Sequence, residues 1–162
     1  MSLSLNRGQV AFGSAMGRIQ LAGASTWGVG ASGYFYKISS GKATQLTATD
    51  DTLTGWVDVG FKLSDANIVS NLLTVPTITT SYEFLTYGPG AAFLLPVASG
   101  QTLAVTDVGK PINISVSSGI QSADLTNTGT KSFLFVLPPT PEEIAANIVR
   151  VYINPAKYGI GS

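Results

Sequence analysis

The sequence predicts a small all-β protein, a β-barrel or sandwich with one short helix near the C-terminus. Two observations lead to this prediction. Runs of β-branched and aromatic residues recur at spacings of about ten residues and are separated by turns rich in Gly, Ser and Pro. Only one segment carries a clear helix-start signal. The length of 162 residues suits one compact domain with a buried core.

Composition divides the chain into three parts. Residues 1–33 are rich in Gly, Ala and Ser and carry few large apolar side chains, so we expect an extended, loop-rich N-terminal arm. Residues 34–155 contain the β-type runs and form the predicted β-rich domain. Residues 156–162 follow the last predicted strand as a mobile C-terminal tail.

The predicted domain begins with a meander. A strand at residues 34–38 leads through a hairpin turn at 39–42 into a second strand, because Ser40-Gly41 can supply the positive φ angles of a tight turn. A polar turn at 48–52 precedes a third strand that starts at Gly55. Further strands are expected at residues 72–80, 82–87, 92–96, 103–105, 112–116, 132–137 and 149–153.

The predicted helix starts at a capping box. Thr140 provides the cap, Pro141 occupies the first helical position and Glu143 the third. We therefore expect a helix over about residues 141–147, in which the charges of Glu142 and Glu143 complement the helix dipole.

Charge argues against polyanionic partners. Nine basic and nine acidic residues are scattered without runs and give a net charge of zero, so we expect neither nucleic acid nor a membrane surface as a partner. No apolar run approaches the roughly 18 residues of a membrane span, and the opening segment lacks an export signal. Charged residues make up only 11%, against about 25% in ordinary soluble domains. Such a surface suits packing against neighbours.

Several kinds of catalytic and metal site are excluded by composition. The chain has no His and no Cys, which removes Ser-His-Asp and Cys-His nucleophile systems, disulfides, and histidine or thiolate metal sites. We therefore assign no catalytic, cofactor-binding or metal-binding residue and expect a protein that is not an enzyme.

Three local motifs invite a functional interpretation. Gly28-Val-Gly30-Ala-Ser-Gly33 matches a dinucleotide-binding fingerprint, but strand-like residues follow where a helix should begin, so we interpret it as a turn segment. Asp50, Asp51 and Asp58 lack the spacing of a calcium loop and are interpreted as surface turn residues. Asn113-Ile-Ser115 fits a glycosylation acceptor, to which we assign no role.

Two larger sets of side chains leave other functions open. Paired carboxylates can cleave glycosidic bonds. The available carboxylates are Glu83, Asp107, Asp124, Glu142 and Glu143. A sugar-stacking platform would draw on Trp27, Tyr34, Phe35, Tyr36, Trp56, Tyr82 and Tyr87. We expect core or interface packing for most of these aromatic residues, since that is their commoner use.

Residues 33–60 resemble a segment of the head decoration, or cement, proteins of tailed bacteriophages. The resemblance covers a strand, a Gly-containing hairpin at 39–42, a second strand, a polar turn at 48–52 and a strand opening with Gly55. It implies a non-catalytic virion structural protein, made in the host cytoplasm, that binds the outer face of the capsid. Its partners would be the major capsid protein, whose neighbouring subunits it would clamp, and further copies of itself, as a trimer.

Other functions are compatible with the same residues. A phage tail-tube or other virion structural protein shares the composition of a ring-forming β-barrel with a Gly-rich arm. A carbohydrate-binding or adhesin module would use exposed aromatic residues. An enzyme relying on carboxylates alone is the third alternative.

Overall fold

The structure, a computed structural model, confirms the predicted all-β class. It describes residues 8–21, 26–28, 33–58, 68–69, 72–74, 84–117, 120–127 and 131–159. Strands dominate this part of the chain, and its one α-helix is α1 (Pro141–Ala146), which lies inside the predicted range.

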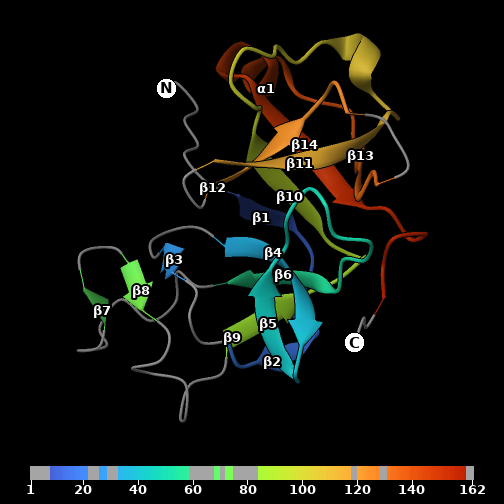
Figure 1. The fold of residues 1–162 in the computed structure, drawn as a ribbon. Coiled ribbons are helices and arrows are strands. Elements are labelled where there is room, and N and C mark those ends of the chain that lie inside the picture. Colours follow the sequence, from blue (N-terminus) through green and yellow to red (C-terminus); the bar gives the residue numbers. More distant parts are fainter. Residues whose placement is uncertain are drawn as a thin grey trace.

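The largest sheet has six antiparallel strands and curls into a half-barrel (Figure 1). Its strands, in spatial order, are β1 (Gln9–Phe12), β10 (Ala92–Pro96), β14 (Ile148–Ile153), β13 (Leu134–Val136), β11 (Pro111–Ser117) and β12 (Ile120–Asp124). The curl brings Val97, the residue after β10, into a parallel bridge with Ala123 of β12. The Ala98 N–H donates to the Ala123 carbonyl at 2.8 Å. We call this six-stranded sheet the curled sheet.

A second sheet of five antiparallel strands lies below the curled sheet (Figure 1). Its strands are β2 (Gly17–Ile19), β9 (Phe84–Tyr87), β6 (Gly55–Asp58), β4 (Gly33–Ser39) and β5 (Lys42–Gln45). A third, three-stranded sheet consists of β3 (Thr26–Gly28), β8 (Leu72–Thr74) and β7 (Ile68–Val69). The meander predicted from the sequence is therefore present as β4, β5 and β6.

Local sequence explains the turns. In the β4–β5 hairpin, Ser40 and Gly41 have φ angles of 51° and 75°, the left-handed pair that the twist of a two-residue hairpin requires. At α1, the Thr140 side chain accepts from the Glu143 N–H, and the Glu143 carboxylate accepts from the Thr140 N–H. The helix ends at Asn147 in the left-handed conformation.

The core lies between the curled sheet and the second sheet. Phe35 of β4 meets Phe93 of β10 edge-to-face, with ring centroids 5.1 Å apart, and Trp56 of β6 lies 5.6 Å from the same Phe93 ring. All three side chains are buried and belong to one apolar cluster that also contains alternate residues of β11, β13 and β14. Burying these faces against each other supplies the main stabilisation of the two-sheet arrangement.

The described part of the predicted arm is built into the sheets. β1 pairs with β10 and β2 pairs with β9, so residues 9–12 and 17–19 each add an edge strand. Both strands are short, and a register irregularity between Val10 and Phe12, followed by Gly13 at a φ angle of 121°, interrupts the first. Sparse apolar residues were therefore compatible with short edge strands as well as with a free arm.

The prediction of a strand at 103–105 was wrong. This segment enters a short 3₁₀ helix, η2 (Val105–Asp107). The Leu103 N–H donates to Asn147 Oδ1 at 2.8 Å, and the Ala104 N–H donates to Asp107 Oδ2 at 2.9 Å. Side-chain oxygens thus accept from the N–H groups that, in a β-strand, would donate to the carbonyls of a neighbouring strand.

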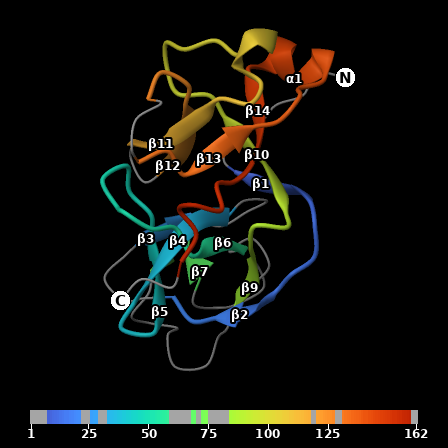
Figure 2. The ribbon, with the colours of Figure 1, turned by 90° about the vertical axis from the view of Figure 1, so that its right-hand side faces the viewer.

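The predicted tail is held at its beginning. Leu53 and Tyr158 form a parallel bridge, the Leu53 N–H donates to the Lys157 carbonyl, and the Gly159 N–H donates to the Leu53 carbonyl. The Thr54 hydroxyl also donates to the Gly159 carbonyl at 2.9 Å. Figure 2 shows this red C-terminal segment running from the curled sheet down to the second sheet. We call residues 154–159, which follow β14, the strap.

Candidate functional site

The buried carboxylate of Glu143 has a structural environment. It accepts from the Thr140 N–H at 2.9 Å and from Arg150 Nε at 3.1 Å and Nη2 at 2.5 Å. The position results from the capping box, which brings the carboxylate over the start of α1, and from β14, which carries Arg150 beside it. The structural role predicted for Glu143 at the helix N-terminus is confirmed, while its neighbour Glu142 is exposed.

Asp107 and Asp124 belong to two separate networks. Asp107 accepts from the Ala104 N–H and from Lys110 Nζ. Burial raises the pKa of Asp107, but these hydrogen bonds outweigh it and the pKa is lowered overall. Asp124 accepts from Gln101 Nε2 at 2.8 Å and from the Thr126 hydroxyl at 2.8 Å.

The pKa of Asp124 is also lowered. Burial acts to raise it, and the donors on Gln101 and Thr126 together with backbone N–H groups act more strongly in the other direction. A general acid at neutral pH needs a raised pKa, so these two carboxylates have the wrong electrostatics for that role. The remaining member of the predicted carboxylate pool, Glu83, lies outside the described residues.

The three aspartates considered for a cation site are dispersed. Asp50 accepts from Lys37 Nζ and from the N–H and hydroxyl of Thr47. Asp51 pairs with Lys131 at 3.1 Å on the surface, and Asp58 ends β6. Within the described ranges, no group of three or more acidic side chains is placed to hold a metal ion.

The described aromatic residues mostly serve the core, as we expected. Tyr34, Phe35, Tyr36 and Trp56 are all buried. Tyr87 packs edge-to-face on Trp56, with ring centroids 5.8 Å apart. A sugar-stacking platform cannot use buried rings. The side chain of Trp27, and all of Tyr82, lie outside what the structure describes.

The Gly-rich motif ends in a packing contact. β4 begins at Gly33, so a strand follows the last Gly of the motif as the sequence predicted. A Cβ at Gly33 would lie 2.2 Å from the Val57 carbonyl and 2.3 Å from the Trp56 ring, which only glycine avoids. Asn113 of the glycosylation motif is buried, and its Nδ2 donates to the Ala48 carbonyl at 3.0 Å.

The outer surface of the curled sheet carries an apolar row that single residues of the sequence did not reveal. Strand registers place Phe12 opposite Ala92, Ala92 opposite Tyr152, Tyr152 opposite Phe135, and Phe135 opposite Pro111. These residues share one face because the intervening positions of β10, β13 and β14 point into the core. We call these five residues the outer row.

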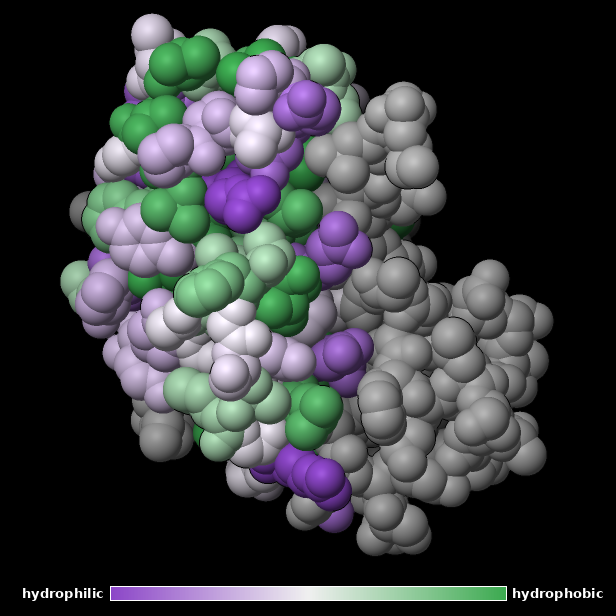
Figure 3. Space-filling view, turned by 180° about the vertical axis from the view of Figure 1, so that it is seen from behind, coloured by the Kyte–Doolittle hydropathy of each residue, from purple (hydrophilic) through white to green (hydrophobic). Residues whose placement is uncertain are grey.

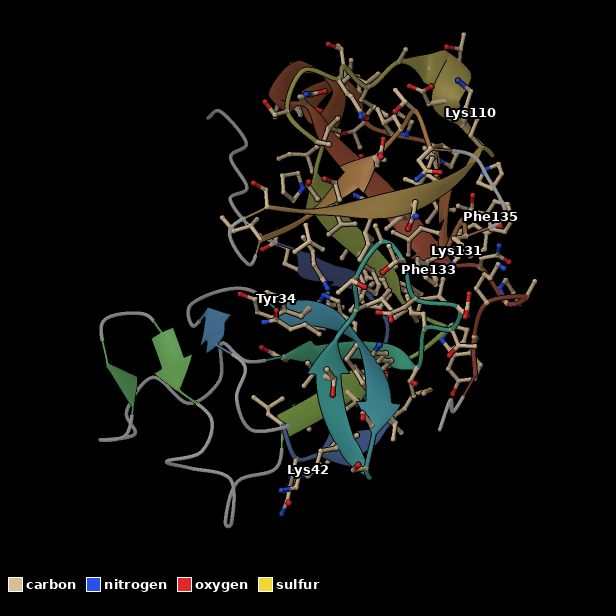
Figure 4. All side chains as sticks on the ribbon, in the orientation of Figure 1. Tyr34, Lys42, Lys110, Lys131, Phe133 and Phe135 are labelled. Carbon is tan, nitrogen blue, oxygen red and sulfur yellow. The ribbon has the colours of Figure 1, made fainter. Side chains whose placement is uncertain are left out.

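Three of the five residues of the outer row are aromatic and partly or largely open to solvent, whereas Ala92 is buried. Phe12, on the edge strand, is 71% exposed. Tyr152 and Phe135 are partly exposed, and their rings stack with centroids 5.3 Å apart and an interplanar angle of 25°. Figure 4 shows Phe135 at the periphery of the curled sheet, whereas Phe133 lies toward the second sheet.

Charge near the outer row is neutralised. Arg150 lies two residues before Tyr152 on β14, and therefore on the same face, and is paired with Glu143. Seen from behind, the described surface is mostly pale or green, with few strongly hydrophilic residues (Figure 3). A second exposed apolar site is the η2 turn, where Val105 is 67% and Val108 39% exposed.

The alternation of inward- and outward-facing residues in the strand 148–153 is a sequence signal for part of the outer row. Even-numbered residues there face outward and odd-numbered residues enter the core. Which residues of other strands line up with Tyr152, however, depends on registers that local sequence does not encode.

Comparison of the chain with protein-family models, curated proteins and solved structures found no match in any of the three. Among the described helices, none has the length and apolar character needed to cross a membrane.

Proposed function

We propose that this protein is a non-catalytic virion structural protein that decorates the outer face of a bacteriophage capsid and clamps neighbouring major capsid subunits. The observation that carries the proposal is the combination of a two-sheet scaffold, held by one shared core, with exposed apolar side chains at Phe12 and Val105. Exposed apolar groups on a rigid sheet scaffold suit association with other proteins.

The carboxylates support the same conclusion. Asp50, Asp107, Asp124 and Glu143 each hold a turn, a helix end or a loop through named hydrogen bonds. Groups committed to such contacts stabilise the fold, and they would lose those contacts if they moved a proton in catalysis. The meander that carries the resemblance to decoration proteins is present as β4, β5 and β6.

Weak contacts suffice for this proposed function. A decoration protein that binds as an oligomer engages several capsid subunits at once, so each further contact forms at a high effective concentration. Its bound state then opposes separation of the subunits that it bridges. A neutral, charge-poor surface makes such binding insensitive to salt, in contrast to binding by ion pairs.

Co-sedimentation with shells assembled from the cognate major capsid protein tests the proposal. We expect saturable binding at a fixed number of copies per shell and a higher temperature of shell disruption, with little change between low and high salt. Absence of binding to expanded and unexpanded shells would overturn it. Stacked rings of the protein alone in electron micrographs would favour the tail-tube alternative instead.

A further inference from the structure

We propose that the strap is an exchangeable segment, which binds either to its own chain or to a second copy of this chain. The binding site is the backbone of Leu53 together with the Thr54 hydroxyl, which we call the strap site. The occupant is the strap of another copy. The proposal goes beyond capsid decoration and does not depend on it.

The strap site is a short strand edge. The Leu53 N–H donates to the Lys157 carbonyl at 2.8 Å, and the Leu53 carbonyl accepts from the Gly159 N–H at 3.0 Å. The Thr54 hydroxyl donates to the Gly159 carbonyl at 2.9 Å. Without the strap, the site presents the unpaired N–H and C=O groups of an edge strand, and such an edge favours the addition of another strand.

The strap loses little when it leaves its site. None of the residues 154–159 is buried, and Pro155, Ala156 and Tyr158 are exposed. The strap is therefore held by hydrogen bonds rather than by burial of apolar side chains. Segments held in this way open at a much lower free energy than the core does.

The strap has a fixed start and a turn that can open. Asn154 anchors the start, since its N–H donates to the Phe133 carbonyl at 2.8 Å and its Nδ2 to the Ser132 carbonyl at 2.9 Å. The turn that follows is closed by two hydrogen bonds within the strap, from the Ala156 N–H to Asn154 Oδ1 at 3.0 Å and from the Lys157 N–H to the Asn154 carbonyl at 2.9 Å. Opening this turn leaves the anchor in place. Residues 155–159, when extended, then reach about 17 Å, which is enough to meet a copy in contact with the first.

The occupant is a second copy because the strap already matches the site. A strap from another copy makes the same three hydrogen bonds to Leu53 and Thr54 that it makes within its own chain. Exchange therefore conserves the contacts of the site, and only the turn after Asn154 changes. This is the condition under which identical segments are swapped between copies at low cost. Copies held side by side favour the exchange further, because each strap site then meets a high effective concentration of neighbouring straps.

Disulfide trapping in the full chain tests the exchange, because the chain contains no cysteine. A Cβ added at Gly159 would lie 3.8 Å from Thr52 Cγ2, so thiols at positions 52 and 159 can bond when the strap occupies its site. A variant with both Thr52→Cys and Gly159→Cys, oxidised at high dilution, should form this disulfide within one chain. That result shows that the strap of the substituted protein occupies the strap site.

The decisive sample mixes the single variants Thr52→Cys and isotope-labelled Gly159→Cys at high concentration. A disulfide between position 52 of one chain and position 159 of the other forms efficiently only when a strap binds a second copy. Mass spectrometry should find about tenfold or more of this link than in a mixture of Val105→Cys with Gly159→Cys. Val105 is the matched control, since it lies on the η2 turn and is 67% exposed, so chance collisions favour the control mixture.

Each other outcome overturns the proposal. Equal yields in the two mixtures, or an internal disulfide in the double variant without any link between chains, would rule out exchange. Absence of the internal disulfide, in reduced variants that unfold at the wild-type temperature, would rule out the strap site itself. Shell binding is scored separately: exchange without binding leaves this inference standing and overturns the decoration function, whereas binding without exchange does the reverse.

Discussion

The Gln121 side chain joins the two sheets by hydrogen bonding to the backbone of Phe35. Its Oε1 accepts from the Phe35 N–H at 2.7 Å, and its Nε2 donates to the Phe35 carbonyl at 2.9 Å and to the Leu46 carbonyl at 2.9 Å. Gln121 belongs to β12 of the curled sheet and Phe35 to β4 of the second sheet. A side-chain amide thus takes the place of a neighbouring strand at a buried position.

Replacing Gln121 by Ala should lower the free energy of unfolding by about 3 kcal/mol, because a buried N–H and a buried carbonyl lose partners and a cavity forms. Denaturant titration measures the loss. Ser122→Ala, on the opposite face of β12, is the matched control and should change stability by less than about 0.5 kcal/mol. Equal effects of the two substitutions would show that the amide adds nothing specific.

Gln121→Glu should be destabilising in a pH-dependent way. An ionised carboxylate can accept from the Phe35 N–H but faces the carbonyls of Phe35 and Leu46, of which only the Phe35 carbonyl keeps another donor, the Leu46 N–H. Burial and those carbonyls raise the pKa of the introduced acid. Its contribution is therefore complete below the ordinary glutamate pKa of the unfolded chain and is lost as pH rises from there through the raised folded pKa. The gap in denaturation midpoint between wild type and Gln121→Glu should widen from pH 4 to pH 8, and a constant gap would contradict this account.

Glu143 should tolerate loss of its charge better than loss of its side chain. Glu143→Gln retains an acceptor for the Thr140 N–H and should cost about 1 kcal/mol, whereas Glu143→Ala loses both the cap and the Arg150 contacts and should cost about 3 kcal/mol. Thermal unfolding of both variants tests the order. Glu142→Gln, exposed one residue earlier in α1, is expected within about 0.5 kcal/mol of wild type; an effect as large as that of Glu143→Ala would contradict a cap-specific role.

Acid should destabilise the fold through Asp50, Asp107 and Asp124. Their pKa values are lowered in the folded protein, so the unfolded chain takes up protons first as pH falls. The stability that they contribute is complete above the ordinary aspartate pKa of 3.8 and disappears as pH drops through the folded values. Asp107→Asn should therefore differ from wild type at pH 7 and converge with it at low pH. Asp51→Asn, at an 87% exposed side chain, should follow wild type throughout.

The β4–β5 turn should respond in opposite directions to two substitutions. Gly41→Ala should cost about 1 kcal/mol, since φ is 75° there. Ser40→Asn should add a few tenths of a kcal/mol, because Asn tolerates the left-handed conformation better and Asn-Gly is the preferred hairpin pair. Paired denaturation curves measure both, and equal signs would show that the backbone angles do not decide the turn.

The sequence predicted those elements whose signals are local. The α1 capping box at Thr140, the hairpin at Ser40-Gly41 and the strand at 92–96 were all readable because the chemistry that makes them lies within a few residues. The same limit explains the error at 103–105. Its N–H groups are taken by Asn147, 44 residues away, and by Asp107 in the following turn.

The features that matter most for the candidate site were not predictable in this way. β12 has the sequence Ile-Gln-Ser-Ala-Asp, in which Ile120 is the only β-branched residue and no residue is aromatic, so it gives a weak strand signal, yet it carries Gln121. Its pairing with β11 and the curl of the sheet create the strand. The outer row likewise exists only once five strands adopt their registers, and no window of sequence contains Phe12 and Phe135 together.

The place of β14 has a consequence for how the protein is made. This strand is the last of the chain's described strands, but it lies in the interior of the curled sheet, between β10 and β13, and the strap that follows it reaches back to Leu53. During translation β14 leaves the ribosome after β10 and β13, so these two strands lack their shared neighbour until β14 has been made. A chain that stops before β14 lacks that neighbour and leaves the facing edges of β10 and β13 unpaired, where other chains can add a strand. Only a chain that includes β14 can complete the curled sheet.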